Sequence, residues 1–394
     1  MDPRANSSLI SRLGQMARSL ESQFLGKEEV VRLLLISMVA GEHAVLVGPP
    51  GTAKSALLRA FARALDARYF EYLLTRFTEP NEIFGPVDIA AFREGKYVRR
   101  IEGMLPEAEI VFLDEVFKSN SAILNALLTL LNERRYTSGG QVIRCPIISA
   151  FGASNEVPAD ESLTAVFDRF LLRIRSDYLD AYHFHGLLTK GLEHEMIAMQ
   201  GEPQKETLVR ANEILEAQRN LGTATRFTEE FFSHYKSLVF QIRAEGVSLS
   251  DRRVVKILKL FAASAFLDGR AEPDPSDFFL LKHVWNNQDQ AVVLESLVNP
   301  VLEAFYRQNP NKKRVGALAI GIEALAGEID RVRQVLVGAT TMTDVQLFAQ
   351  LKVLRDVKAA LATMADARAP ELNKRIDQLL EATFKSGRFA QLQL

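Results

Sequence analysis

His-Ala-Val-Leu-Val-Gly-Pro-Pro-Gly-Thr-Ala-Lys-Ser, at residues 43–55, is the stretch around which the rest of the chain can be interpreted. Ala44–Val47 is a short apolar run typical of a buried parallel strand. A loop with two glycines and two prolines follows it, and the residues after Ser55 favour a helix. A loop between a strand and a helix start directs backbone N–H groups and the positive end of the helix dipole toward one point. This arrangement predicts a binding site for a polyphosphate.

The predicted phosphate-binding loop consists of Gly48, Pro49, Pro50, Gly51, Thr52, Ala53, Lys54 and Ser55. In loops of this type the lysine reaches the β- and γ-phosphates and the next hydroxyl holds Mg²⁺, so these roles fall to Lys54 and Ser55. The general pattern has glycine where this chain has Ala53. We expect a negative φ at Ala53, because a residue with a Cβ permits close backbone approach only in that conformation. For the octapeptide alone, an ordinary Gly/Pro turn is the alternative explanation.

The composition is that of a globular protein. The chain has 394 residues, enough for two or three domains, and is 47% hydrophobic and 25% charged. Its net charge of −1 gives no global basic field for nucleic acid or anionic membrane, and its single cysteine excludes a disulfide framework. The sequence has no apolar run of about 18 residues and no signal-peptide pattern, so we expect a soluble, cytoplasmic protein. Three histidines lack companion ligands at metal-site spacing, so no metal site is expected at His183, His185 and His194.

Apolar stretches alternate with helical patterns along the first half of the chain, which predicts an α/β fold. The further stretches expected to form strands are Arg68–Leu74, Ile110–Leu113, Ile147–Ser154 and Phe170–Ile174. Such alternation is typical of a parallel sheet with helices on both faces. Because these sheets bind ligands at the carboxyl ends of their strands, the residues that follow the strands are expected to meet in one crevice.

Two carboxylates and an amide occupy such positions. Asp114 and Glu115 end the third apolar stretch. Phosphoryl transfer needs a carboxylate that holds Mg²⁺, together with a group that orients or deprotonates the attacking water. We assign the first role to Asp114, beside Ser55, and the second to Glu115. Asn155 ends the next strand and is a candidate for positioning the same water, although asparagine is also a common turn residue.

Three arginines are candidates for contact with phosphates. Arg169 lies just before the last predicted strand, where it either pairs with Asp168 at the surface or reaches the γ-phosphate of a neighbouring subunit. Arg252 and Arg253 begin a later helix, where a positive charge is unfavourable by about 0.3–1 kcal/mol. Two arginines at an unfavourable position suggest a bound polyphosphate, with simple solvent exposure as the alternative.

The chain divides into three parts. Residues 1–190 carry the α/β pattern, residues 206–308 are almost wholly helical, and residues 313–394 contain three helical stretches typical of a hairpin or bundle. The breaks between them are rich in glycine, proline and polar residues. Within the first part, residues 87–101 and 136–144 each have the pattern of a β-hairpin.

These motifs resemble those of the MoxR family of AAA+ ATPases, and most closely its RavA-type members. The family's Walker A motif, which tolerates alanine before the lysine, is similar to Gly-Pro-Pro-Gly-Thr-Ala-Lys-Ser at 48–55. Its Walker B segment is similar to Leu-Pro-Glu-Ala-Glu-Ile-Val-Phe-Leu-Asp-Glu at 105–115, and its next helix resembles residues 123–134. The resemblance covers about residues 20–290. Beyond residue 310 the helical pattern departs from the small β-containing insertion expected of the RavA type.

The resemblance implies roles for the candidate residues. Asn155 is expected to be sensor 1 and Arg169 the arginine finger. Arg252 is expected to be sensor 2, with Arg253 as the alternative. These residues, together with Glu115, would form the catalytic set.

The resemblance also implies an activity. The protein is expected to bind ATP and ADP with Mg²⁺ and to hydrolyse ATP as a homo-hexameric ring. It would act as a chaperone-like remodeller with a von Willebrand factor A (VWA) domain protein. The hairpin at 83–104 would be the insert in helix 2, and the hairpin at 136–144 would precede sensor 1. Motion of the helical lid would reach the partner through these two hairpins.

Two other classes of function are open from the residues alone. The first is a nucleic-acid motor or loader, for which the candidate basic patch is Arg93, Lys96, Arg99 and Arg100. A σ54-type transcription activator is less well supported, because the Gly-Ala-Phe-Thr-Gly-Ala loop of that family is absent. The second is a nucleotide-gated scaffold that does not hydrolyse ATP, and the presence of Glu115 and Asn155 argues against it.

Overall fold

The computed structural model of the chain describes residues 3–158, 161–179, 191, 207–309, 312, 322–338, 344–362 and 368–385. The chain divides into two compact units. The first comprises residues 1–178 with 204–309, and the second comprises residues 179–203 with 310–394. The predicted α/β part and the predicted lid therefore pack together in the first unit.

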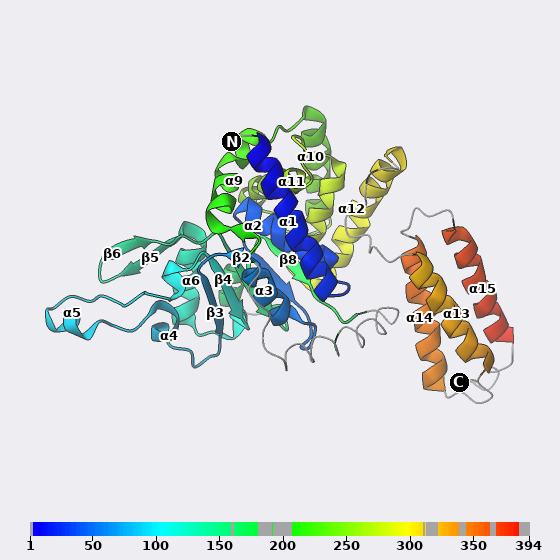
Figure 1. The fold of residues 1–394 in the computed structure, drawn as a ribbon, viewed down its shortest axis with the longest axis horizontal. Coiled ribbons are helices and arrows are strands. Elements are labelled where there is room, and N and C mark those ends of the chain that lie inside the picture. The colour runs from blue at the N-terminus through cyan, green and yellow to red at the C-terminus, as the bar shows by residue number, and fades with distance from the viewer. Residues whose placement is uncertain are drawn as a thin grey trace. The chain divides into compact units, whose positions relative to one another are not determined.

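A five-stranded parallel sheet forms the centre of the first unit (Figure 1). Its spatial order is β3 (Tyr69–Leu73), β4 (Ile110–Asp114), β7 (Ser149–Ser154), β1 (Ala44–Val47) and β8 (Leu172–Arg175). All four neighbouring pairs are parallel, and β1 and β7 are buried along their whole length. Strands buried on both faces have continuous apolar sequences, which is why the sequence pattern located them. The predicted α/β fold is confirmed.

Helices connect and cover these strands. They are α1 (Pro3–Gln23), α2 (Glu28–Ala40), α3 (Lys54–Arg63), α6 (Ser121–Glu133) and α7 (Glu161–Phe167). Helix α3 contacts β4 and β7, and helix α2 contacts β8. Short 3₁₀ turns, η1 (Leu105–Glu107) and η2 (Val116–Lys118), lie on either side of β4. A small second sheet pairs β2 (Leu65–Asp66) with β9 (Val209–Arg210).

The two predicted hairpins have different outcomes. The second is confirmed, because β5 (Arg135–Ser138) and β6 (Gln141–Arg144) form an antiparallel pair. The first is wrong as a hairpin of two strands. After α4 (Pro80–Phe84) the chain forms a short helix, α5 (Ile89–Arg93).

The cause of this difference is a helix cap. The Asp88 carboxylate accepts hydrogen bonds from the N–H groups of Ala90 and Ala91 and so starts the helix. The antiparallel pattern is reduced to one bridge, between Val87 and Arg99.

The lid consists of helices. They are α9 (Ala211–Ala224), α10 (Glu229–Ala244), α11 (Asp251–Leu267), the 3₁₀ segment η4 (Pro275–His283) and α12 (Gln288–Gln308). Tilted and edge-to-face aromatic rings from α10, α11 and η4 fill its core, including Phe231, Tyr235, Phe261 and Phe278. Helix α11 packs against α2 of the α/β part, so the lid is joined to the core through that helix.

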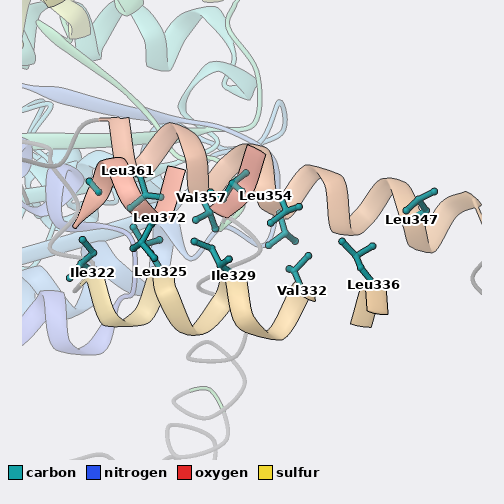
Figure 2. Close-up of a cluster of buried hydrophobic side chains, with 13 residues drawn as sticks. Ile322, Leu325, Ile329, Val332, Leu336, Leu347, Leu354, Val357, Leu361 and Leu372 are labelled. Carbon is teal, nitrogen blue, oxygen red and sulfur yellow. The ribbon is translucent and has the colours of Figure 1, made fainter. Parts of the chain in front are cut away.

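The second unit contains three described helices, α13 (Ile322–Gly338), α14 (Asp344–Ala362) and α15 (Ala369–Lys385). Their facing sides share one apolar cluster, in which Leu325, Ile329, Leu354, Val357 and Ile376 are fully buried (Figure 2). The three described helices therefore pack together as a helical bundle.

Candidate nucleotide site

The phosphate-binding loop runs from the carboxyl end of β1 to the start of α3, as predicted. The N–H group of Gly48 donates a hydrogen bond to Ser154 O (3.1 Å), which fastens the loop to the end of β7. A Cβ at Gly48 would lie 2.2 Å from Ser176 O, so glycine is required there. The expectation of a negative φ at Ala53 is wrong. Its φ is 61° and its ψ is 20°, because the residue is the left-handed N-cap that turns the chain into α3.

Lys54 lies at the centre of the site. Its ammonium group donates to Gly48 O (2.7 Å), Pro49 O (2.8 Å) and the Asn155 side-chain oxygen (3.1 Å). Burial lowers the pKa of Lys54, while Asp114 and Glu115 oppose that shift. The lysine therefore directly contacts both the loop and the residue proposed as sensor 1.

Ser55 and Asp114 lie together, as the sequence predicted. The Ser55 hydroxyl donates to Asp114 Oδ2 at 2.7 Å, and Asp114 Oδ1 accepts the N–H of Glu115 at 3.0 Å. A hydroxyl and a carboxylate next to a phosphate loop are oxygen donors of the kind that Mg²⁺ takes, with phosphates and waters completing its shell. The residues present therefore fit Mg²⁺.

Glu115 and Asn155 also meet in this crevice. The Asn155 amide group donates to Glu115 Oε1 at 2.5 Å, so Asn155 bridges Lys54 and Glu115. Glu115 Oε1 also pairs with Lys118, whereas its buried Oε2 has no hydrogen-bond partner within the described structure. The backbone of Glu115 is left-handed, with a φ of 52°. A strained backbone and a buried unpaired oxygen are both features of functional sites.

Arg169 is partly exposed and lies near the amino end of β8. Its guanidinium is 3.7 Å from Asp168 Oδ2, and 26% of its side chain is exposed. The surface pairing considered for it is therefore present, though at a long distance. Asp168 also contacts Arg173 (3.4 Å) and the lid residue Arg253 (3.7 Å) through Oδ1.

The hydrogen bonds of the two lid arginines lie away from the phosphate loop, and the role of Arg252 as sensor 2, with Arg253 as the alternative, stays a prediction. Arg252 donates to the Asn132 side-chain oxygen (3.0 Å) and lines a cavity together with the residues that precede β1. This position is at the amino ends of the strands, whereas the phosphate loop follows their carboxyl ends. Arg253 is buried and donates to Val284 O (2.7 Å) and the Asn286 side-chain oxygen (2.8 Å).

Two buried cations near the site were missed in the sequence. Arg173 projects from the middle of β8, where its guanidinium lies 4.5 Å from the centre of the Phe167 ring and donates to Trp285 O (2.7 Å). Lys27 donates to the Ser176 hydroxyl (3.1 Å) and Asp177 O (3.0 Å), and Ser176 contacts Thr52 of the phosphate loop. The signal for Arg173 was a charged residue within an apolar strand.

The order of the parallel sheet, the loop after β1 and the acids after β4 define the class of P-loop ATPases with a helical lid. A family model for the MoxR domain of MoxR–vWA–beta-propeller ternary systems matches residues 11–219, more than half of the chain. A model for the AAA lid domain matches residues 234–298. The chain therefore belongs to the MoxR family of AAA+ ATPases, as its motifs predicted.

Individual relatives agree with this assignment. Two uncharacterized proteins of Methanocaldococcus jannaschii are 34% and 38% identical to the chain. The alignments cover 78% and 71% of this chain and 79% and 72% of the relatives. Protein MoxR of Paracoccus denitrificans is 31% identical over 42% of this chain and 50% of its own length.

A solved structure supports the fold. The structure of a candidate ATPase from Cytophaga hutchinsonii superposes with a TM-score of 0.61 at 20% identity. It covers 76% of this chain and 96% of that one.

Two further expectations concern regions away from the site. His183, His185 and His194 lie outside the described residues. None of the described helices is both long and apolar enough to cross a membrane.

Proposed function

We propose that the protein hydrolyses ATP with Mg²⁺ and uses the energy to remodel partner proteins. The observation that carries the proposal is the hydrogen-bonded chain from Lys54 through Asn155 to Glu115, beside the Ser55–Asp114 pair. A lysine for the phosphates, a carboxylate and hydroxyl for the metal, and an acid for water are the parts that phosphoryl transfer requires. A scaffold that only binds nucleotide has no need of an acid that activates water.

Each residue has a distinct task in this proposal. Lys54 and the loop N–H groups bind and orient the β- and γ-phosphates, and Ser55 and Asp114 hold Mg²⁺. When bound, Mg²⁺ neutralises charge that develops on the phosphate oxygens. Glu115 orients the attacking water and accepts its proton. Asn155 fixes the position of Glu115 relative to Lys54.

Arg169 is proposed to act on the nucleotide of the next subunit in a homo-hexameric ring. It lies near the amino end of β8, whereas its own phosphate loop follows the carboxyl end of β1, so Arg169 is better placed to serve a neighbour. Asp168 links this segment to the lid through Arg253. Movement of α11 would therefore displace the arginine finger.

A chain of aromatic contacts connects the catalytic acid with the lid. Phe117, two residues after Glu115, packs edge-on against Phe167, with ring centres 5.5 Å apart. Phe167 in turn contacts Trp285 at 6.0 Å. Because all three rings are buried and packed, a shift of η2 on hydrolysis would displace Trp285 in the lid.

Two projecting segments are suited to binding a protein partner. They are residues 83–104, called the first insert below, and the β5–β6 hairpin, called the second insert. Ile89 and Phe92 on α5 and Val142 on β6 are 66%, 59% and 62% exposed. The inserts also contact each other, since a Cβ at Gly139 would lie 1.8 Å from Tyr97 O. Exposed apolar side chains on adjoining projections are typical of protein-binding surfaces. We propose a VWA-domain protein as the partner, because the matching family model describes MoxR domains in MoxR–vWA systems.

The basic patch on the first insert gives little support to the nucleic-acid alternative. Arg99 donates to the Asn81 side-chain oxygen and Gly85 O, both at 2.6 Å. Arg100 pairs with Asp88 and Lys96 with Glu94. Three of the four cations are thus engaged locally, which leaves little free charge for phosphates of a nucleic acid.

The proposal is tested by measuring ATP binding and phosphate release. The wild-type protein should bind ATP and release phosphate only with Mg²⁺ present, and Lys54→Ala should do neither. Lys96→Ala, an exposed lysine on the first insert, is the matched control and should behave as wild type. Binding without any phosphate release by the wild-type ring would favour the scaffold, and DNA-stimulated release would favour the motor.

A further inference from the structure

A second cavity lies at the amino ends of the strands, apart from the phosphate loop. It has a volume of about 510 Å³ and is bounded by the turn before β1, the end of α6, the base of the β5–β6 hairpin and one face of α11. Six cationic side chains and two carboxylates line it, an excess of four positive charges. The cations are Arg134, Arg135, Arg144, Arg252, Lys256 and Lys259.

Two of the cations, Lys256 and Lys259, share one carboxylate. Glu42 is 3% exposed and accepts from Lys256 (2.9 Å) and Lys259 (2.6 Å). This cluster joins the lid to the turn before β1. This cluster keeps one positive charge, and the four arginines with Glu133, the second carboxylate, carry the other three.

These four arginines have no ionic partner in the described part of the chain. Arg134 donates to Gly41 O (2.6 Å) and Arg252 to the Asn132 side-chain oxygen (3.0 Å), both neutral acceptors. Arg135 and Arg144 lie directly opposite each other in the β5–β6 ladder. Like charges at directly opposed positions destabilise a sheet, and a bound anion would relieve that repulsion.

Two residues of the cavity wall, Arg134 and His43, also favour an anion. Burial lowers the pKa of Arg134, Glu42 opposes this shift and Arg144 adds to it. Its backbone is left-handed, with a φ of 53°. The other non-glycine residues with positive φ in the described structure are Ala53 and Glu115, both in the nucleotide site. Burial holds the pKa of His43 at about 4, so this wall residue is neutral and adds no charge.

We propose that this cavity binds a small polyphosphate anion of the pyrophosphate or tripolyphosphate class. Guanidinium groups bind phosphate oxygens in a bidentate geometry, and four arginines line this cavity. The excess of four charges matches an oligophosphate better than a single carboxylate. The volume lies within the range of small-ligand sites of about 300–1,000 Å³. Because Arg252 belongs to the lid and Arg135 and Arg144 to the hairpin, the bound anion would tie these elements together.

The test uses the full chain carrying Lys54→Ala, so that the phosphate loop no longer competes for the anion. Sodium tripolyphosphate should bind saturably in calorimetry and raise the melting temperature, with an affinity that falls as salt increases. Adding Arg135→Gln and Arg144→Gln should weaken binding at least about tenfold, since each loses a charge-assisted contact. The matched control adds Arg93→Gln and Lys96→Gln instead, two exposed cations outside the cavity, and should leave the affinity unchanged.

Two results would overturn the proposal. One is the absence of saturable binding to the Lys54→Ala protein. The other is an equal loss of affinity when either pair of substitutions is added to Lys54→Ala. If the Arg135/Arg144 pair fails to fold by circular dichroism, Arg144→Gln alone serves and should still weaken binding. A further arm adds Arg169→Ala and measures binding at a concentration where sedimentation shows monomers. Binding of tripolyphosphate by the monomer would show that the cavity of one subunit is sufficient for the anion. Binding confined to assembled protein would refute the proposal.

Discussion

The nucleotide site depends on two residues with unfavourable backbone conformations. Ala53 precedes Lys54 in the loop, and Glu115 follows Asp114 at the end of β4, and both have left-handed dihedral angles. For residues with a Cβ this conformation costs about 1–2 kcal/mol each. At Glu115 the conformation turns the carboxylate back toward Asn155, so the strain accompanies the contact on which hydrolysis is proposed to depend.

Ala53→Gly should raise the free energy of unfolding by about 0.5–1 kcal/mol, because glycine adopts a positive φ without the steric penalty. Part of the gain is offset by the greater entropy of glycine in the unfolded chain. The measurement is chemical denaturation of the two proteins under identical conditions.

The control for Ala53→Gly is Ala60→Gly, within α3, which should lower stability by about 1 kcal/mol, as glycine does in helix interiors. Opposite signs for the two substitutions confirm the left-handed conformation. Destabilisation by both would show that Ala53 has ordinary helical dihedral angles.

The positions of the proposed catalytic residues were predictable because they depend on local sequence and one topological rule. Asp114 and Asn155 each end an apolar strand, and the carboxyl ends of parallel strands share one edge of the sheet. The position of Arg252 could not be predicted in the same way, because it depends on how the lid packs on the core. Nothing in the residues around Arg252 encodes the distant pairing of Lys256 and Lys259 with Glu42.

At the scale of elements, this pairing connects α11 of the lid to the turn before β1. Burial alone would raise the pKa of Glu42, but Lys259 and Lys256 outweigh it and the pKa is lowered. The folded-state pKa thus lies below the unfolded value. The pairing contributes its full stability above that unfolded value, near 4.5, and loses it as the pH falls through the folded-state pKa.

The double substitution of Lys256→Met and Lys259→Met should cost about 3 kcal/mol at pH 7, because it leaves a buried carboxylate unpaired. The pKa of Glu42 should then rise above the unfolded value, so stability should increase as the pH is lowered from 7 toward 5, whereas the wild-type pairing contributes a constant stability over this range. Denaturation at several pH values measures both effects. Adding Glu42→Gln to the double variant should remove this increase, and a double variant whose stability does not increase as the pH falls toward 5 would disprove the buried pairing.

Elements defined by strong hydrophobic period were predicted well, and the first insert was not. Helices α9 to α11 and the three described helices of the second unit lie in the segments predicted to be helical, because apolar spacing alone locates them. Residues 89–93 have no buried side chain, so no apolar pattern could fix their structure. The N-cap at Asp88 instead determines that these residues form a short helix.

At the scale of the whole molecule, the placement of Arg169 predicts that single subunits are poor enzymes. Arg169→Ala should bind ATP but lose about 10³–10⁵ in hydrolysis rate, the usual effect of an arginine finger. Mixing it with Lys54→Ala subunits should restore activity, because each subunit supplies what the other lacks. In a random one-to-one mixture about a quarter of the interfaces are productive in a head-to-tail ring.

Phosphate release from the mixture, compared with each variant alone, is the measurement. The control mixes Lys54→Ala with Lys54→Ala/Arg169→Ala, which offers no intact phosphate loop and should stay inactive. No recovery in the first mixture, with rings verified by sedimentation, would mean that Arg169 does not act between subunits.

The most direct test of the nucleotide site is phosphate release by Glu115→Gln at saturating Mg²⁺ and ATP, with ATP affinity measured on the same sample. The amide keeps the shape of the side chain but cannot accept a proton, so turnover should fall by about 10²–10⁴ while affinity is retained. The matched control is Glu156→Gln, an exposed carboxylate one residue after Asn155, which should have wild-type turnover. Normal turnover by Glu115→Gln would contradict the assignment of Glu115 as the residue that activates water.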